Sequence, residues 1–255
     1  MQILFMAKKG LGISLICREP LEEILLAYMS NVLIDYQDTV EHTSLDGSIG
    51  NVQIDNQLWD AQYSVVLFVS PATRSDEYRH MPAITFNVVR MKTEHDNAEI
   101  YKHLMVQIKN LTLNLEEELL CKVFKFAGIT RSDEEMERLD ESFAHETQNI
   151  LVNATKTAKR FYFGTLKLAL NQIKLSVTKS MKLSGDLVAV KTKLGLSLIA
   201  FEDALIDLDA FIRVHPFESI NFLTNAVVKH YTDELLSQAV LILGATDFLG
   251  NFLTL

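Results

Sequence analysis

The chain has 255 residues, of which 48% are hydrophobic and 22% are charged, and its formal net charge is −9. With only 10 Gly and 4 Pro, this globular composition excludes a long flexible linker and a collagen-like or Pro-rich region. Two distant cysteines, Cys17 and Cys121, exclude a disulfide framework and indicate a reducing, cytosolic setting. No apolar run approaches the ~18 residues of a spanning helix. The start, MQILFMAKKG, places its lysines after its apolar residues, the reverse of a secretory signal.

Alternating apolar and polar residues predict strands of an antiparallel meander over the first ~115 residues. The predicted strands are 13–17, 26–36, 48–58, 63–69, 83–91 and 100–115. In the third, Val52 and Ile54 share one face and polar residues the other. The last strand changes phase near Asn110, where its apolar positions switch from even to odd numbers. Because such a shift moves every following side chain to the opposite face, we predict a bulge or twist at Asn110.

Helical spacing begins at residue 116 and lasts to about 126, where Gly128 is placed to cap the helix. A capping box at Ser132 then predicts an acidic helix that continues, with interruption, to about Arg160. Residues 160–177 are predicted to be a strand with a second phase shift before Ile173. The remaining predictions are a short helix over 186–194, a segment left open between strand and helix over 196–212, and a long helix over 217–243 that Gly244 ends.

These elements predict an α+β fold, in which a twisted antiparallel meander is followed by amphipathic helices. The predicted parts are a strand-rich segment that ends in a short helix (1–128), an acidic helical connector (129–160), and a strand with a C-terminal amphipathic helical region (161–255).

No pattern in the sequence indicates catalysis. None of the seven histidines forms a metal-binding or catalytic motif, and Gly10-Leu11-Gly12 lacks the third glycine of a dinucleotide loop. Asp207 and Asp209 could share a cation, but two ligands without a third are weak evidence. We therefore assign no catalytic residue, no cofactor site and no metal site, and predict that the chain is not an enzyme.

The charge is unevenly distributed, since residues 156–195 hold nine Lys or Arg and one acid. This segment is either a basic surface neutralised by acids of the same molecule, or a patch that meets anionic lipid, which attracts such segments by about 1 kcal/mol per basic residue. Nucleic acid is disfavoured because aromatic residues do not alternate with the basic ones. The candidate lipid-contacting lysines are Lys167, Lys174, Lys179 and Lys182.

The helix over 217–243 allows two interpretations. Its apolar residues follow helical spacing, and they could pack on the sheet or lie on a membrane surface. The candidate membrane contacts in this helix are Ile220, Leu223, Val227, Tyr231 and Leu235.

Several ordered segments resemble the C-terminal region of the vacuolar protein sorting-associated thirteen family, which are chorein-type bridge-like lipid transfer proteins. These segments include NVQIDNQL (51–58), IYKHLM (100–105), GTLKL (164–168), QIKLSV (172–177), FEDA (201–204), RVHP (213–216), ELLSQ (234–238) and DFLGN (247–251). The resemblance covers nearly the whole chain. It departs from the family at Ala210 and Phe252, where prolines are expected, and at Leu196-Ser197, where Phe-Pro is expected.

The resemblance implies a groove of strands, apolar inside, along which phospholipids move between organelle membranes. The C-terminal part of such a protein attaches to a membrane with the help of amphipathic helices and adaptor-binding domains. The groove-lining candidates are Val52, Ile54, Leu104, Val106, Ile108, Leu166 and Leu168. About seven strands at ~4.8 Å give roughly 34 Å of groove, close to one bilayer core, so we expect an end-piece or small carrier rather than a bridge.

Two hypotheses follow. In the first, the chain is the C-terminal portion of an intermembrane lipid-transfer protein, docks on organelle membranes, and contributes to phospholipid transport and vacuolar or Golgi protein sorting. In the second, it is a protein-interaction module that binds adaptor proteins without touching lipid. Both place it in the cytoplasm, peripheral on organelle membranes.

Overall fold

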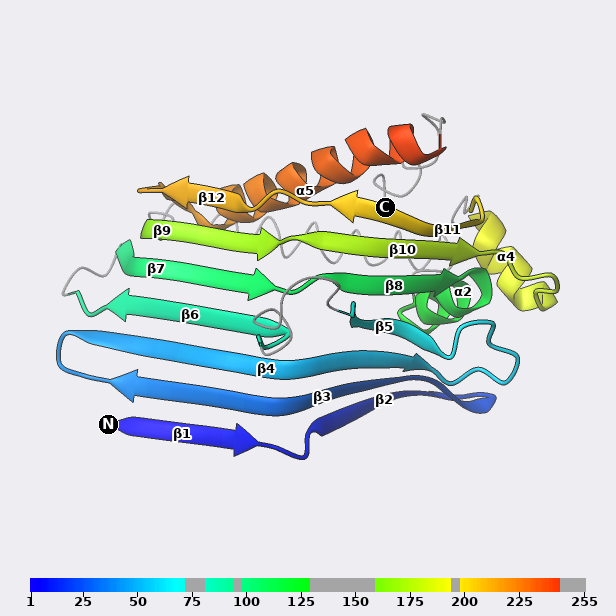
Figure 1. Ribbon diagram of the computed structural model, residues 1–255, viewed down its shortest axis with the longest axis horizontal. Helices are drawn as coiled ribbons and strands as arrows, with labels where there is room; N and C mark the ends of the chain where they lie inside the picture. Colours follow the sequence, from blue (N-terminus) through cyan, green and yellow to red (C-terminus); the bar gives the residue numbers. More distant parts are fainter. Residues whose placement is uncertain (72–80, 94–97, 129–158, 194–197, 244–255) are drawn as a thin grey trace, which may run out of the picture.

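The computed structural model describes residues 1–71, 81–93, 98–128, 159–193 and 198–243, with the backbone alone for 239–243. Within these residues, one sheet of thirteen strands carries three helices, labelled as in Figure 1. This architecture agrees with the predicted α+β class. The acidic helix predicted over 129–160 lies outside the described residues except for its last two positions.

The order of elements follows the sequence prediction closely. The first part contains β1 (Gln2–Ala7), β2 (Leu11–Arg18), β3 (Leu21–Asp38), β4 (His42–Asn56), β5 (Val65–Val69), β6 (Ile84–Met91), β7 (Ala98–Ile108), β8 (Leu111–Glu116) and α2 (Glu117–Phe126). The second part contains β9 (Arg160–Leu170), β10 (Gln172–Thr178), α4 (Gly185–Lys193), β11 (Phe201–Asp207), β12 (Phe211–Val214), β13 (Phe217–Ser219) and α5 (Ile220–Leu243).

Long strands and end-to-end pairs of shorter strands build the sheet. Across the sheet the strands occupy seven neighbouring positions. β1 and β2 lie end to end in the first position, and β3 and β4 fill the second and third. The next four positions each hold two strands end to end: β6 and β5, β7 and β8, β9 and β10, and β12 and β11. We call the half with β1, β6, β7, β9 and β12 the first wing, and the half with β2, β5, β8, β10 and β11 the second wing. β3 and β4 run through both wings (Figure 1).

The sheet is mixed, so the prediction of a purely antiparallel meander is wrong. β9 runs parallel to β7, and β10 runs parallel to β8. Each paired residue of β7 or β8 lies opposite the residue 62 positions later in the chain, from the pair Ala98 and Arg160 to the pair Glu116 and Thr178. Parallel neighbours need a long crossover, which residues 117–159 supply here. Alternation within a strand reports its faces but not the direction of its neighbour, which is why the sequence did not reveal this pairing.

A crease separates the two wings. At this line each strand ends or changes phase, so that the residues of both wings keep the same face toward the helices. In β3, Asn31 adopts a φ of 52°, and Gly50 lies opposite, where an added Cβ would be 2.7 Å from the Asn31 Cβ. Between β7 and β8 the break falls at Lys109 and Asn110, which confirms the predicted irregularity at Asn110.

Main-chain hydrogen bonds hold the crease together. They are Asn31 N to Lys8 O (3.4 Å), Ala83 N to Gly50 O (3.2 Å), Lys109 N to Ala83 O (2.8 Å) and Leu208 N to Asn171 O (2.8 Å). The second predicted phase shift, before Ile173, falls at Asn171 on this line, between β9 and β10. The crease is therefore a property of the whole sheet and not of one bulged strand.

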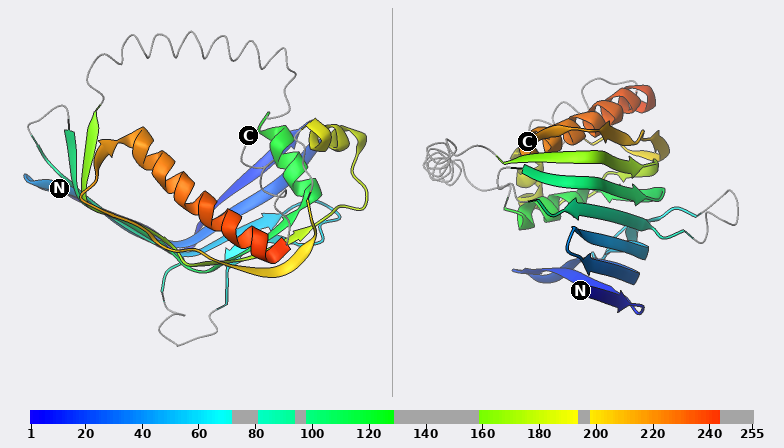
Figure 2. Two further views of the ribbon diagram at one scale, coloured as in Figure 1. Left: turned by 90° about the horizontal axis from the view of Figure 1, so that it is seen from above. Right: turned by 90° about the vertical axis from the view of Figure 1, so that its left-hand side faces the viewer.

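All three helices lie on the concave side of the bent sheet (Figure 2). α2 and α4 pack together at the far end of the second wing, and α5 lies over the last strands. Gly128, at φ 71°, follows the end of α2 as predicted, and its N–H donates to the Lys125 carbonyl. The segment 196–212, left open between strand and helix, supplies β11 and β12. The long helix starts three residues later than predicted because 217–219 pairs with β9 as β13.

Candidate functional site

The concave face of the first wing is largely apolar, with Arg213 of β12 opposite Leu166 as a charged exception. Directly opposed residues of neighbouring strands point to the same face, so the pairing defines rows that run across the sheet. The first row is Ile3, Tyr36, Leu45, Val88, Leu104 and Leu166. The next is Phe5, Ile34, Gly47, Phe86, Val106, Leu168 and Phe211, and the third is Ala7, Val32, Ile49, Ile84, Ile108 and Leu170.

The second wing continues the same apolar face beyond the crease. One row there comprises Ile13, Ala27, Ile54, Leu67, Leu113, Leu175 and Ala204. A shorter row comprises Val69, Leu111, Ile173 and Ile206. The phase changes at the crease therefore keep one continuous apolar surface on the concave side of a bent sheet.

The convex face of the first wing is more polar. One of its rows comprises Leu4, Asp35, Asp46, Asn87, Met105, Lys167 and Ile212, and the face carries a shallow cavity of about 550 Å³. The Asp35 carboxylate accepts hydrogen bonds from the Gln2 amide at 3.0 and 3.1 Å. The concave face is thus the more continuously apolar of the two, although the convex face also exposes apolar side chains such as Leu4, Met105 and Ile212.

The described helices cover only parts of the concave face. Leu223 of α5 is buried against Phe163, Leu166 and Phe211. Leu119 of α2 is buried against a second cluster, which contains Ile24, Leu58 and Val66. Toward the β1–β2 edge, apolar side chains of the same face remain open: Ile3 is 47% exposed, Phe5 46%, Leu45 36%, Leu11 43% and Ile13 66%.

All seven predicted groove-lining residues lie on the concave face. Val52 and Ile54 lie in the second wing, while Leu104, Val106, Ile108, Leu166 and Leu168 lie in the first. The structure thus brings them to one surface, although Leu104, Leu166 and Leu168 already contact the cluster beneath α5. Their contact with lipid stays a prediction.

The predicted membrane contacts are not brought together. Lys167 and Lys174 alternate with concave-face residues and so point to the convex side, where Lys174 pairs with Asp203 at 2.9 Å. Lys179 and Lys182 lie in the loop between β10 and α4. On α5, Leu223, Val227 and Tyr231 pack on the sheet, Leu235 is half-buried, and only Ile220 is exposed. The structure therefore shows the sheet-packed interpretation of this helix.

Polar side chains of α5 bind main-chain groups at the break between β11 and β12 and in β9. Asp207 N donates to Gln238 Oε1 at 2.9 Å, and Gln238 Nε2 donates to the Asp207 carbonyl. Asp209 N donates to Glu234 Oε2 at 2.9 Å, and the Tyr231 hydroxyl donates to the Leu168 carbonyl at 2.7 Å. Burial raises the pKa of Tyr231 above its ordinary value. The sequence did not predict these contacts, because the residues of a helix do not indicate which distant main-chain groups lie against it.

An ion pair between a buried carboxylate and a partly exposed lysine joins α2 to α4. The Glu117 side chain is 2% exposed, and its Oε1 lies 2.6 Å from Lys191 Nζ. Its Oε2 accepts a hydrogen bond from Ser180 N at 3.2 Å. Beside it, Cys121 is fully buried against Leu187 and Val190, and this burial raises the pKa of the thiol. Both groups fasten the helices together and face no open site.

No metal-binding cluster occurs in the part of the chain that the structure describes. No three His, Cys, Asp or Glu residues there are placed to share a metal ion. Among the described helices, none combines the length and apolar character needed to cross a membrane. The concave face offers a continuous apolar contact area.

Comparison with known proteins places the chain in a class. The curated relatives that match it over nearly its whole length are intermembrane lipid transfer proteins of the VPS13 type. The chain is therefore homologous to a segment of the C-terminal region of that family, which confirms the resemblance seen in the sequence. No family model and no solved structure matches it.

Three relatives show the extent of the match. Human VPS13D is 40% identical over 252 residues, which is 98% of this chain and 6% of the relative. Vps13D of Drosophila melanogaster is 34% identical over 243 residues, covering 95% of this chain and 6% of the relative. VPS13 of Chaetomium thermophilum is 25% identical over 255 residues, covering 95% of the chain and 8% of the relative. The chain thus spans less than a tenth of the length of these relatives.

Proposed function

We propose that the concave face holds the acyl chains of phospholipids and forms one stretch of a lipid-transfer path. The observation that carries this proposal is the set of apolar rows that cross seven neighbouring strands and stay partly uncovered toward β1. Burying a CH₂ group contributes about 0.8 kcal/mol, so ten buried methylenes would contribute roughly 8 kcal/mol without any headgroup recognition. The names of the relatives, intermembrane lipid transfer proteins, support the same function.

The dimensions limit what this stretch does alone. Seven strands at ~4.8 Å place the first and last roughly 29 Å apart, about the hydrocarbon thickness of one bilayer. The segment would therefore dock peripherally on an organelle membrane on the cytoplasmic side and contribute to phospholipid transport, and through it to vacuolar or Golgi protein sorting. It would act without catalysis, as a surface along which lipids move.

Neighbouring residues of β1 provide a matched test. Phe5 points to the concave face and is 46% exposed, while Leu4 points to the convex face and is 59% exposed. The purified chain and the variants Phe5→Glu and Leu4→Glu would be extracted, and bound phospholipid counted by mass spectrometry. We expect Phe5→Glu to reduce bound phospholipid several-fold and Leu4→Glu to leave it unchanged. Equal lipid content in both variants, or none in the parent chain, would reject the proposal.

An adaptor-binding function is the second candidate, and the β1 edge favours it. Main-chain groups on the outer side of β1 have no strand partner among the described residues, and side chains on both of its faces are exposed. Such an edge can accept an additional strand from a partner protein. A stoichiometric protein complex lost in Phe5→Pro, with no lipid in the purified chain, would favour this function over the first.

A further inference from the structure

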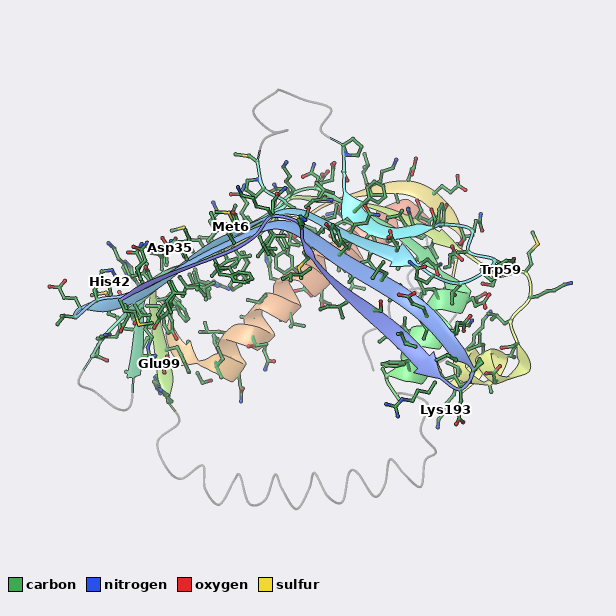
Figure 3. All side chains as sticks on the ribbon, turned by 90° about the horizontal axis from the view of Figure 1, so that it is seen from below. Met6, Asp35, His42, Trp59, Glu99 and Lys193 are labelled. Carbon is green, nitrogen blue, oxygen red and sulfur yellow. The ribbon has the colours of Figure 1, made fainter. Side chains whose placement is uncertain are left out.

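One end of the second wing exposes three large apolar side chains on three separate loops. Trp59, in the connection from β4 to β5, is 95% exposed. Met181, between β10 and α4, is 103% exposed, and Leu21, at the β2–β3 turn, is 82% exposed. The strand ends place all three loops at the same end of the sheet (Figure 1), and Figure 3 shows Trp59 there, away from the sheet body. Exposed apolar side chains that gather at one end of a molecule are typical of a surface that contacts a partner or a membrane.

Basic residues accompany these side chains. Lys179 and Lys182 flank Met181, and neither makes an ion pair with any residue that the structure describes. The loops also contain Glu19 and Asp60, so the end is not uniformly positive. The lysines concentrate on the Met181 loop, where apolar and cationic groups alternate. Such a loop complements a bilayer surface, whose headgroups are anionic and whose interior is apolar.

The opposite end of the sheet gives a comparison. Val40, at the β3–β4 turn, is 92% exposed and thus equally open. Lys92, the cation beside that turn, forms an ion pair in which its Nζ lies 2.7 Å from Asp38 Oδ1. Exposed apolar groups therefore occur at both ends, but at the Val40 end the adjacent lysine is already neutralised by a carboxylate.

We propose that the end formed by the Trp59, Met181 and Leu21 loops touches the surface of a bilayer that contains anionic lipid. Trp59 lies at headgroup depth there, the level that its amphipathic indole ring favours. Lys179 and Lys182 contact the anionic headgroups. The inference rests on the proposed lipid function for its partner, and it assigns the contact to loops rather than to α5, which is packed on the sheet.

The sequence supplies its own reporter, because Trp59 is the only tryptophan of the chain. Adding phosphatidylcholine vesicles with phosphatidylserine should shift the emission of Trp59 to shorter wavelength and protect it from aqueous acrylamide. High salt should reverse both effects, since surface charge is screened. In the double variant Trp59→Phe/Val40→Trp the reporter sits at the other end, and its emission should stay unchanged while vesicles still bind.

Charge variants test the lysines. Lys179→Gln/Lys182→Gln should weaken vesicle binding roughly 30-fold, about fivefold for each lysine near an anionic surface. Lys167→Gln, on the convex face, should leave vesicle binding unchanged. An unshifted Trp59 in protein that sediments with vesicles would overturn the inference. So would a shift produced only by a partner protein and never by vesicles.

Different results would reject the lipid-binding function of the concave face and the membrane contact of the Trp59, Met181 and Leu21 loops. Phospholipid that co-purifies with the chain reports on the concave face, and Trp59→Ser should not alter its amount. Loss of vesicle binding in Trp59→Ser with unchanged co-purifying lipid would support the inference. Unchanged vesicle binding in Trp59→Ser would overturn it and leave the lipid-transfer function standing.

Discussion

Replacing Leu223 with Ala tests whether α5 belongs to the sheet. Leu223 is 5% exposed and lies against Phe163, Leu166 and Phe211, so truncation removes nearly all of its buried contacts. Leu→Ala at such sites costs about 2–5 kcal/mol of the free energy of unfolding, a large share of the 5–15 kcal/mol typical of a domain. The neighbouring Phe222 is 57% exposed and serves as the matched control.

Urea denaturation and hydrogen exchange would measure both effects. We expect Leu223→Ala to lower the unfolding midpoint and to speed exchange of the α5 amides. Phe222→Ala should change the free energy of unfolding by less than about 1 kcal/mol, because it loses little buried area. If the two substitutions cost the same, α5 is held by something other than its packing on β9 and β12.

Three further predictions follow from the described contacts. Lys191→Met should cost about 3–5 kcal/mol in unfolding experiments, because it leaves the Glu117 carboxylate buried without its counter-charge. Gly164→Ala should lower the melting temperature, since its Cβ would lie 2.5 Å from a backbone oxygen of β7, an overpacking that costs about 1–3 kcal/mol. Lys159 holds the pKa of Glu99 below its usual range, so this pair stabilises the fold above the ordinary carboxyl pKa of about 4.3 and is lost as pH falls further.

Each of these has a control. Gly12→Ala meets nothing closer than 3.9 Å and should be neutral, and an equal loss in both glycine variants would refute the steric argument. Glu117→Gln/Lys191→Met removes both charges and should be less harmful than Lys191→Met alone. In Glu99→Gln the unfolding midpoint should vary less with pH on the acid side, and an unaltered pH profile would show that the ion pair contributes nothing.

Much of the concave face could be predicted from alternation alone. The periodicity located nearly every strand, placed Val52 and Ile54 on one face, and identified the phase change at Asn110. These predictions succeeded because the face to which a strand residue points depends on its local spacing, which is read directly from the sequence. The sequence did not show that this phase change belongs to a crease across every strand, because that depends on how β7 pairs with its neighbours.

Other features depended on contacts between distant segments. The parallel pairing of β9 with β7 has no local signature, because it is set by a connection that crosses the sheet. The amphipathic pattern of α5 fitted a membrane surface as well as a sheet, and the buried environment of Leu223 decides between them. Trp59 is the only tryptophan of the sequence, but its exposure depends on the fold around it.

The constant offset of 62 residues between β7–β8 and β9–β10 also affects how the protein is made. The first eight strands pair antiparallel with near neighbours and can assemble while the ribosome is still adding residues. Until residues 160–178 arrive, however, the outer edge of β7 and β8 stays available to other nascent chains. Substitutions that delay the pairing of β9 should therefore cause aggregation during synthesis, before the chain is complete.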